Sequence, residues 1–301
     1  MSNFKKTLAG IIAAGALLAL AGGTMAGFNA STVNPGNVLS NGTVTMTNVA
    51  GTVISGSNCT TATNNGTCAT LFGTGNTSFK PGGPDAANSA TITYTGSSTP
   101  TSDFRLYAGN YTAKLAASSA LCTAPSSGAG NPGTALDLLV TVGSSSPSLL
   151  YPAASTTLSA SGGLASGTSY TSLSVASAPA LASGQEIILY SAGTYQQVTT
   201  SAAVIAGATT IPVTSFSANF SYPASTTQIA LQGTLDNFAS TYATSGTGLQ
   251  LRGGTNGSGA AGAWATSDSS VFNIKVHLDG AAGNSFQGCQ SQTDLDWYAA
   301  A

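Results

Sequence analysis

The chain consists of short apolar runs separated by turn residues, and no long segment keeps the 3.6-residue apolar period of an amphipathic helix. Residues 43–49 alternate between small polar and apolar side chains, which is typical of a half-buried strand. Further runs of this kind lie at 90–94, 104–107, 111–115, 136–142, 249–252, 271–278 and 295–298. Seven or more short strands with polar turns predict an antiparallel β-sandwich.

Residues 150–231 interrupt this pattern. They include one charged residue, Glu186, and no cysteine, and the strand pattern that precedes them resumes after them. The sequence therefore predicts a small inserted β-domain at 150–231, within a sandwich domain formed by residues 27–149 and 232–301.

The inserted segment contains a faint internal duplication. Residues 164–175 resemble residues 204–213, and each copy is followed by an apolar strand, at 186–190 and at 228–231. Two copies of a hairpin plus a strand would form a small β-roll or barrel. The alternative is chance similarity in a background rich in Ser, Thr and Ala.

The amino terminus has the features of a secretory signal peptide. Lys5 and Lys6 precede an apolar stretch from Leu8 to Ala21, and residues 24–26 provide small residues for cleavage. The apolar stretch is shorter than the roughly 20 residues of a membrane span, which favours a cleaved signal peptide over the alternative, a retained anchor. We expect residues 1–26 to be removed between Ala26 and Gly27, and the mature protein to be secreted to the extracellular matrix or cell surface, with no membrane attachment after processing.

Export makes disulfides the expected state of the cysteines. Cys59 and Cys68 flank a polar stretch that resembles a surface loop, which favours a local pair and leaves Cys122 with Cys289. The sequence allows three pairings and does not fix the connectivity.

Composition narrows the functional classes. Charged residues make up 5% of the chain and the formal net charge is −2, with seven Lys and Arg residues. A nucleic-acid surface needs clustered basic residues to neutralise phosphates, so we expect no nucleic-acid partner. The hydrophobic fraction of 42% is sufficient for a folded core.

Catalytic and metal-binding motifs are missing from the sequence. His277 is the single histidine, and there is no His-Glu-x-x-His, no CxxC pair and no Gly-x-Ser-x-Gly elbow. Asp294 and Asp296 would share one strand face, with Leu295 and Trp297 directed inward. The candidate roles of this pair are general acid–base catalysis and Ca²⁺ binding, and the alternative is a solvated strand face. We expect His277 to face solvent or a structural partner, and we predict neither an enzyme nor a cofactor.

Five ordered segments together resemble the TasA/camelysin family of secreted matrix-fibre proteins with SipW-type signal peptides. They are the leader junction at Leu20–Asn29, the strand at Asn37–Met46 with Gly42-Thr43-Val44, the turn Lys80-Pro81-Gly82, the strand Phe104–Tyr107, and the closing Asn284–Gly288 with Trp297–Ala300. The chain departs from the family in its few Lys and Asp residues, its cysteines and its inserted segment.

The resemblance implies a jelly-roll-like sandwich whose subunits join end to end into a homopolymer. It implies that the segment after the cleavage site adds as a strand to a neighbouring subunit, because a donor peptide satisfies the unpaired N–H and C=O groups of an open sheet edge. Residues 27–36 are the candidate donor strand, in which Gly27 and Asn29 flank Phe28, and Phe28 and Val33 would fill apolar pockets. A frayed terminus is the alternative.

The sequence also contains Asn-x-Ser/Thr sequons, which become meaningful if the organism glycosylates its surface proteins. The candidate glycosylation sites are Asn29, Asn41, Asn58, Asn65, Asn76, Asn110, Asn219 and Asn256.

Two functional hypotheses follow. The first is a structural subunit of extracellular filaments, in a biofilm matrix or a pilus-like fibre, with other matrix components or glycans as further candidate partners. The second is a monomeric surface adhesin or glycan-binding module that uses the inserted segment. Its candidate sugar-stacking rings are Tyr170, Tyr190, Tyr195 and Tyr222, for which packing inside the small domain is the alternative.

Overall fold

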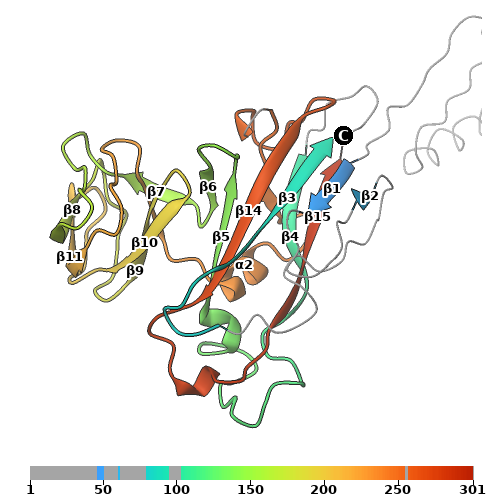
Figure 1. Cartoon of the computed structure of the whole chain (residues 1–301), viewed down its shortest axis with the longest axis horizontal. Coiled ribbons are helices and arrows are strands. Elements are labelled where there is room, and N and C mark those ends of the chain that lie inside the picture. Colours follow the sequence, from blue (N-terminus) through green and yellow to red (C-terminus); the bar gives the residue numbers. More distant parts are fainter. Residues whose placement is uncertain (1–45, 51–59, 62–78, 95–102, 255–256, 301) are drawn as a thin grey trace, which may run out of the picture. The chain divides into compact units, whose positions relative to one another are not determined.

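The computed structural model describes residues 46–50, 60–61, 79–94, 103–254 and 257–300. These residues fold mainly into antiparallel strands, which confirms the all-β prediction (Figure 1). They belong to one compact unit that spans residues 44–301.

The sandwich consists of two antiparallel sheets. The larger has six strands in the order β2-β1-β3-β14-β5-β6, and the smaller has three in the order β13-β4-β15. The strands of the first are Met46–Ala50 (β1), Thr60–Thr61 (β2), Ala86–Tyr94 (β3), Leu136–Val142 (β5), Ser148–Tyr151 (β6) and Ser269–Leu278 (β14). Those of the second are Asp103–Thr112 (β4), Leu249–Gln250 (β13) and Gln292–Ala300 (β15).

Both sheets contribute side chains to one hydrophobic core. Phe104 on β4 stacks on Trp264 with ring centroids 4.3 Å apart, and Trp264 in turn stacks on Phe272 of β14 at 6.2 Å. All three side chains are fully buried. Leu295 and Trp297 of β15 pack against this core, as the alternation of that strand predicts.

The observed elements extend several of the predicted ones. The two runs at 104–107 and 111–115 belong in part to one continuous strand, β4, and the run at 136–142 is β5. Leu235–Thr241 forms a short helix, α2, whose Thr234 cap accepts a hydrogen bond from the backbone N–H of Asn237. Short 3₁₀ turns lie at Pro132–Thr134 and Asn284–Phe286. No helix in the described part of the chain has the length and apolar character needed to cross a membrane.

Residues 154–231 form two further sheets with a core of their own. A four-stranded sheet has the order β10-β9-β12-β7, and β8 pairs with β11. Side chains from both sheets form a separate apolar cluster that includes Leu173, Leu189, Ile211 and Ile229. The strands are Ala154–Thr157 (β7), Ser169–Ser174 (β8), Glu186–Ser191 (β9), Thr194–Thr199 (β10), Thr210–Ser217 (β11) and Gln228–Leu231 (β12).

The pairing of these strands is that of two equivalent halves related by an approximate two-fold axis. In the first half, residues 154–191, the strands are β7, β8 and β9; in the second half, residues 194–231, they are β10, β11 and β12. β9 pairs with β12 around the Ile188–Ala230 pair, and β8 pairs with β11 around the Leu173–Ile211 pair. The remaining equivalences are visible in the isolated bridges, where Leu158–Val175 matches Thr200–Val213 and Leu164–Tyr222 matches Val204–Leu181.

Each outer strand of this unit pairs with the other half, β7 with β12 and β10 with β9. Neither half therefore completes its own sheet. The equivalent turns also match, since Gly167 and Gly207 both have the positive φ that glycine adopts without strain, +77° and +87°. These symmetric pairings support the internal duplication over chance similarity.

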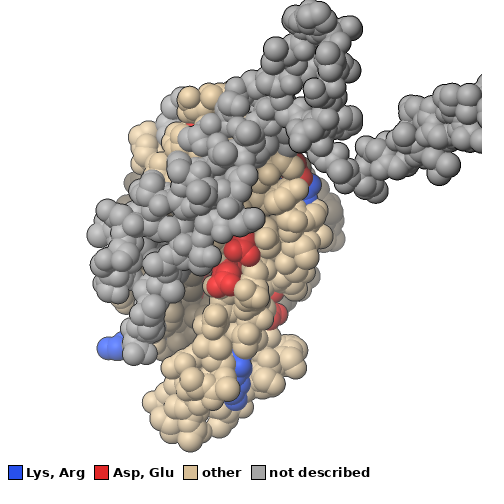
Figure 2. Space-filling model, turned by 90° about the vertical axis from the view of Figure 1, so that its right-hand side faces the viewer, with Lys and Arg blue, Asp and Glu red and all other residues tan. Residues whose placement is uncertain are grey.

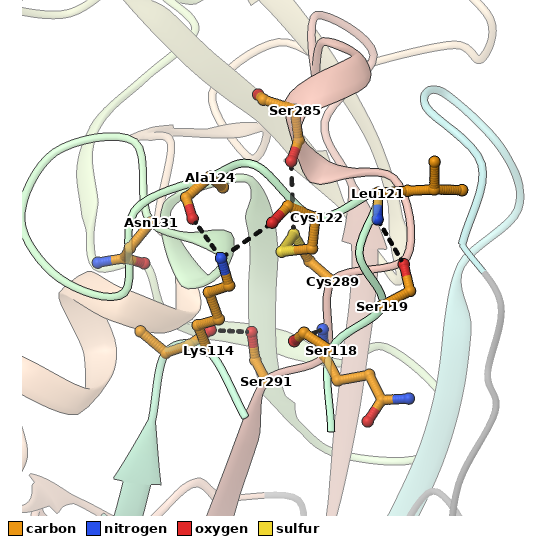
Figure 3. The surroundings of a disulfide bond; sticks show 12 residues. Lys114, Ser118, Ser119, Leu121, Cys122, Ala124, Asn131, Ser285, Cys289 and Ser291 are labelled. Atoms are coloured by element: carbon orange, nitrogen blue, oxygen red, sulfur yellow. Dashed lines mark hydrogen bonds between the residues drawn. A yellow bond between two sulfur atoms is a disulfide. The ribbon is translucent and has the colours of Figure 1, made fainter. Parts of the chain in front are cut away.

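A disulfide joins Cys122 to Cys289, as the sequence led us to expect, across a sequence separation of 167 residues. The loop around Cys122 is held by the Lys114 ammonium, which donates hydrogen bonds to the carbonyl oxygens of Cys122 at 3.0 Å and Ala124 at 2.8 Å (Figure 3). Nearby, Ser291 Oγ donates to the carbonyl oxygen of Ala113 at 2.6 Å. The bond therefore ties the loop after β4 to the segment that leads into β15.

We expect the double variant Cys122→Ser/Cys289→Ser to lose about 3–5 kcal/mol of unfolding free energy, because the closed loop restricts the unfolded chain. Urea unfolding of the two proteins measures the loss. The matched control is dithiothreitol, which should have a smaller effect on the double variant than on the native protein. Equal stability of the native protein and the variant would contradict a stabilising role of this bond.

Candidate functional site

A group of two buried and three half-buried polar side chains lies where the outer face of β5 and β14 meets β9, β10 and β12. A small apolar cluster marks this contact and includes Leu139, Ile188, Tyr190 and Ala230. Beside it lie polar side chains from the sandwich and from the inserted unit with the segment that follows it. We call this group the polar seam and define it as Asp137, His277, Tyr195, Gln197 and Gln232.

Strand alternation explains how the sandwich places two titratable groups there. On β5, Leu138 and Val140 face the main core, so Asp137 and Leu139 face the opposite side. On β14, Phe272 and Ile274 face the core, and His277 lies opposite Asp137 in the antiparallel register.

Asp137 has no exposed surface, and amide groups satisfy both of its carboxyl oxygens. Gln197 Nε2 donates to Oδ2 and Gln232 Nε2 donates to Oδ1, each at 2.6 Å. His277 Nε2 lies 3.1 Å from Oδ2. The inserted unit and the segment after it thus supply the hydrogen bonds that a buried carboxyl group requires.

His277 is 6% exposed and both of its ring nitrogens have partners. Nδ1 lies 3.0 Å from the Tyr195 hydroxyl, and Nε2 lies 3.1 Å from Gln197 Oε1. The Tyr195 hydroxyl donates its hydrogen to Asp85 Oδ1 at 2.6 Å, so Nδ1 must donate to the hydroxyl oxygen.

Burial governs the titration of the seam. It raises the pKa of Asp137 from 3.8 to about 7 and lowers the pKa of His277. Both shifts favour the uncharged forms of the two groups. Burial, together with the neighbouring Asp279 carboxylate, also raises the pKa of Glu186.

Lys275 adds a cation at the edge of the seam. Its ammonium donates to the carbonyl oxygen of Gly193 at 3.0 Å and lies 5.5 Å from the centroid of the Tyr195 ring. The Lys275 side chain therefore holds the turn between β9 and β10 against β14.

Within the described residues, no group of three or more His, Cys, Asp or Glu side chains is arranged to hold a metal ion. The contacts of the polar seam support a structural role, in which these side chains hold the inserted unit against the sandwich.

The structure resolves the roles left open for several sequence-predicted residues. His277 has structural partners in place of a solvated position. Asp294 and Asp296 are half-buried; Asp294 Oδ2 accepts a hydrogen bond from Asn110 Nδ2 at 2.6 Å, and burial, with Asp294 nearby, raises the pKa of Asp296. The seam itself was not predicted, because Asp137, Gln197 and Gln232 are far apart in the sequence and belong to no motif.

The four tyrosines proposed as sugar-stacking residues do not form one surface. Tyr190 and Tyr222 are 2% and 0% exposed, so their rings pack in the interior. The Tyr195 hydroxyl belongs to the seam, and Tyr170 is half-buried against the apolar cluster of the inserted unit. For Tyr190 and Tyr222, the alternative to sugar stacking, packing in the interior, is therefore the correct one.

Two of the candidate glycosylation sites lie in the described residues. Asn219 is exposed, whereas the Asn110 amide is bonded to Asp294. Other predicted features lie outside the described residues: the signal peptide and its Ala26–Gly27 junction, the donor residues Gly27, Phe28, Asn29 and Val33, the Cys59–Cys68 pair, and the sequons at Asn29, Asn41, Asn58, Asn65, Asn76 and Asn256.

Comparison of the chain with protein-family models, with curated proteins and with solved structures gives no match. Functional inference therefore depends on the residues and contacts described above.

We expect Asp137→Asn to destabilise the protein most at acid pH. The pKa of Asp137 is about 7 in the folded protein and near 4 in the unfolded chain, so its protonation stabilises the fold below pH 4 and this contribution disappears as the pH rises through 7. The loss caused by the substitution should shrink with rising pH by up to about 1.4 kcal/mol per unit.

Urea unfolding of the native protein and the variant, at several pH values between roughly 4 and 8, measures this dependence. Asp236→Asn is the matched control, because Asp236 accepts hydrogen bonds from Tyr111 and Asn131 away from the seam. A constant difference between the native protein and Asp137→Asn over this range would show that Asp137 does not titrate as its burial requires.

Proposed function

We propose that this protein is a secreted structural subunit of extracellular filaments, in a biofilm matrix or a pilus-like fibre. In this proposal the sandwich is jelly-roll-like, and residues 27–36 of one subunit add as a strand to the next. The assembled partner is the protein itself.

The observation that carries the proposal is the edge strand β15. This strand has nine residues, and within the part of the chain that the structure describes it pairs on one side with β4. Its inward side chains, Leu295 and Trp297, already pack in the core. An edge of this length presents a row of backbone N–H and C=O groups that an extended donor peptide can pair with.

Low charge also favours self-association. Figure 2 shows a face on which charged side chains are sparse, in keeping with a chain that is 5% charged. Subunits with little net charge approach one another without strong electrostatic repulsion. The Cys122–Cys289 disulfide is of a kind that persists in an oxidising, extracellular setting.

We expect the secreted protein to form filaments that disappear when residues 27–36 are replaced by a Gly/Ser linker of equal length, because the linker keeps the reach of the segment and removes Phe28 and Val33. Negative-stain electron microscopy measures the outcome, and circular dichroism checks that both proteins are folded. Filaments of equal abundance in both proteins would contradict strand donation, and monodisperse native protein would contradict the filament proposal.

A further inference from the structure

Two loops of the inserted unit are equivalent by its two-fold symmetry and differ in sequence. Ala218 and Ala178 begin them, and each donates its N–H to the residue that follows the turn glycine of the other half. Tyr222 and Leu181 end them, and each forms an isolated bridge to the residue three positions before that glycine. These matching contacts define the same interval in both halves of the unit.

The interval is filled differently in the two halves. Residues 219–221, with the sequence Asn-Phe-Ser, span it in the second half, whereas Pro-Ala at 179–180 spans it in the first. The shorter loop keeps the same contacts at both ends, so the pairing of the halves requires neither a carboxamide nor an aromatic ring there. The Asn-Phe-Ser segment is therefore not explained by the pairing of the strands.

Hydrogen bonds hold the backbone of the longer loop. The Asn219 N–H donates to Gln196 Oε1 at 2.9 Å, and the Asn219 carbonyl oxygen accepts a hydrogen bond from Ser166 Oγ at 3.1 Å. Asn219 is exposed, and within the described residues its side-chain amide has no hydrogen-bond partner. The loop thus presents a free carboxamide to solvent from a fixed backbone.

Phe220, the next residue, is 43% exposed. Its ring meets that of Tyr222 edge to face, with centroids 6.4 Å apart and ring planes at 87°. Tyr222 is fully buried, so the Phe220 ring is supported from the interior and leaves apolar surface in contact with water. A group attached at Asn219 can cover that surface, and burial of apolar area is favourable.

Asn219, Phe220 and Ser221 form an Asn-x-Ser sequon, the acceptor sequence for N-linked glycans. The second sequon in the described residues is engaged in the fold, because Asn110 belongs to strand β4 and its Nδ2 donates to Asp294 Oδ2 at 2.6 Å. A sugar attached at Nδ2 of Asn110 would compete with this bond. The free amide and the neighbouring ring therefore favour Asn219.

We infer that Asn219 carries an N-linked glycan whose first sugar packs over the exposed Phe220 ring. The apolar C–H face of a pyranose suits the electron-rich face of an aromatic ring. The inference rests on the export that the proposed function requires, since glycosylation of this kind occurs on surface loops of secreted proteins.

The modification needs a sugar donor activated at its anomeric carbon by a lipid-linked pyrophosphate, supplied with its transferase by the exporting cell. Asn219 Nδ2 forms a C–N bond to the anomeric carbon as the C–O bond to the pyrophosphate breaks. The pyrophosphate leaves with the bonding electron pair, and one amide proton passes to a base of the transferase. The glycan supplies hydrated surface to a unit whose single charged residue is Glu186.

The protein secreted by its own host tests the modification by intact mass and by mass spectrometry of the peptide that contains Asn219. We expect excess mass on this peptide in the native protein. Asn219→Gln and Ser221→Ala should lose the excess, whereas Ser221→Thr, which keeps the sequon, should retain it. Asn110→Gln is the matched control and should leave the glycan on Asn219 unchanged. An unmodified Asn219 in the secreted native protein would overturn the inference.

Thermal unfolding tests the packing on Phe220. In the glycosylating host, Asn219→Gln should lower the unfolding midpoint by roughly 2 °C, and by less when Phe220→Ala is also present, because the sugar then has no ring to cover. The same proteins from a host without N-glycosylation serve as controls, in which Asn219→Gln should have no effect. An equal shift with and without the Phe220 ring would refute the packing of the sugar on it.

The glycan inference and the filament proposal fail independently. If the secreted protein forms filaments but is unmodified at Asn219, the filament proposal stands and the glycan inference falls. If it is glycosylated at Asn219 and stays monodisperse, the glycan inference stands and the filament proposal falls. A protein retained inside the cell would overturn both.

Discussion

Strand β14 has to satisfy two unlike environments, and the architecture depends on how it does so. It is paired on both sides, with β3 and with β5, and its alternating side chains face opposite directions. Phe272 and Ile274 enter the aromatic core of the sandwich, while Lys275 and His277 face the inserted unit. A strand that is covered on both faces requires polar partners for every polar side chain that it buries.

The inserted unit and the segment that follows it meet this requirement mainly with neutral groups. Gln197, Gln232 and Tyr195 supply amide and hydroxyl partners, so Asp137 and His277 are bonded with few added charges. Breaking such a network leaves a buried carboxyl group unsatisfied, which costs more than the hydrogen bonds gained in making it. The seam therefore fixes the register between the inserted unit and β5, which apolar packing around Leu139 and Ile188 alone would specify less strictly.

Duplication followed by divergence accounts for the inserted unit. The dyad-related pairs, Ile188 with Ala230 and Leu173 with Ile211, keep the strand pairing symmetric. The surroundings of the outer strands are not symmetric, because Gln196 on β10 is hydrogen-bonded to Ser217 and Asn219, whereas β7 carries only alanine, serine and threonine. Pairing is retained since each half needs the other to complete its sheet, whereas side chains at the outer edges are free to change.

The sequence alone determined the all-β class, most strand positions and the inward faces of Leu295 and Trp297, because strand alternation is a local property. It also contained the duplication, and its cysteine spacing favoured the Cys122–Cys289 bond. It did not show that Asp137 and His277 meet Gln197, Tyr195 and Gln232. Those features depend on side chains up to 140 positions apart in the sequence, from Asp137 to His277, and only strand pairing and tertiary packing bring them together.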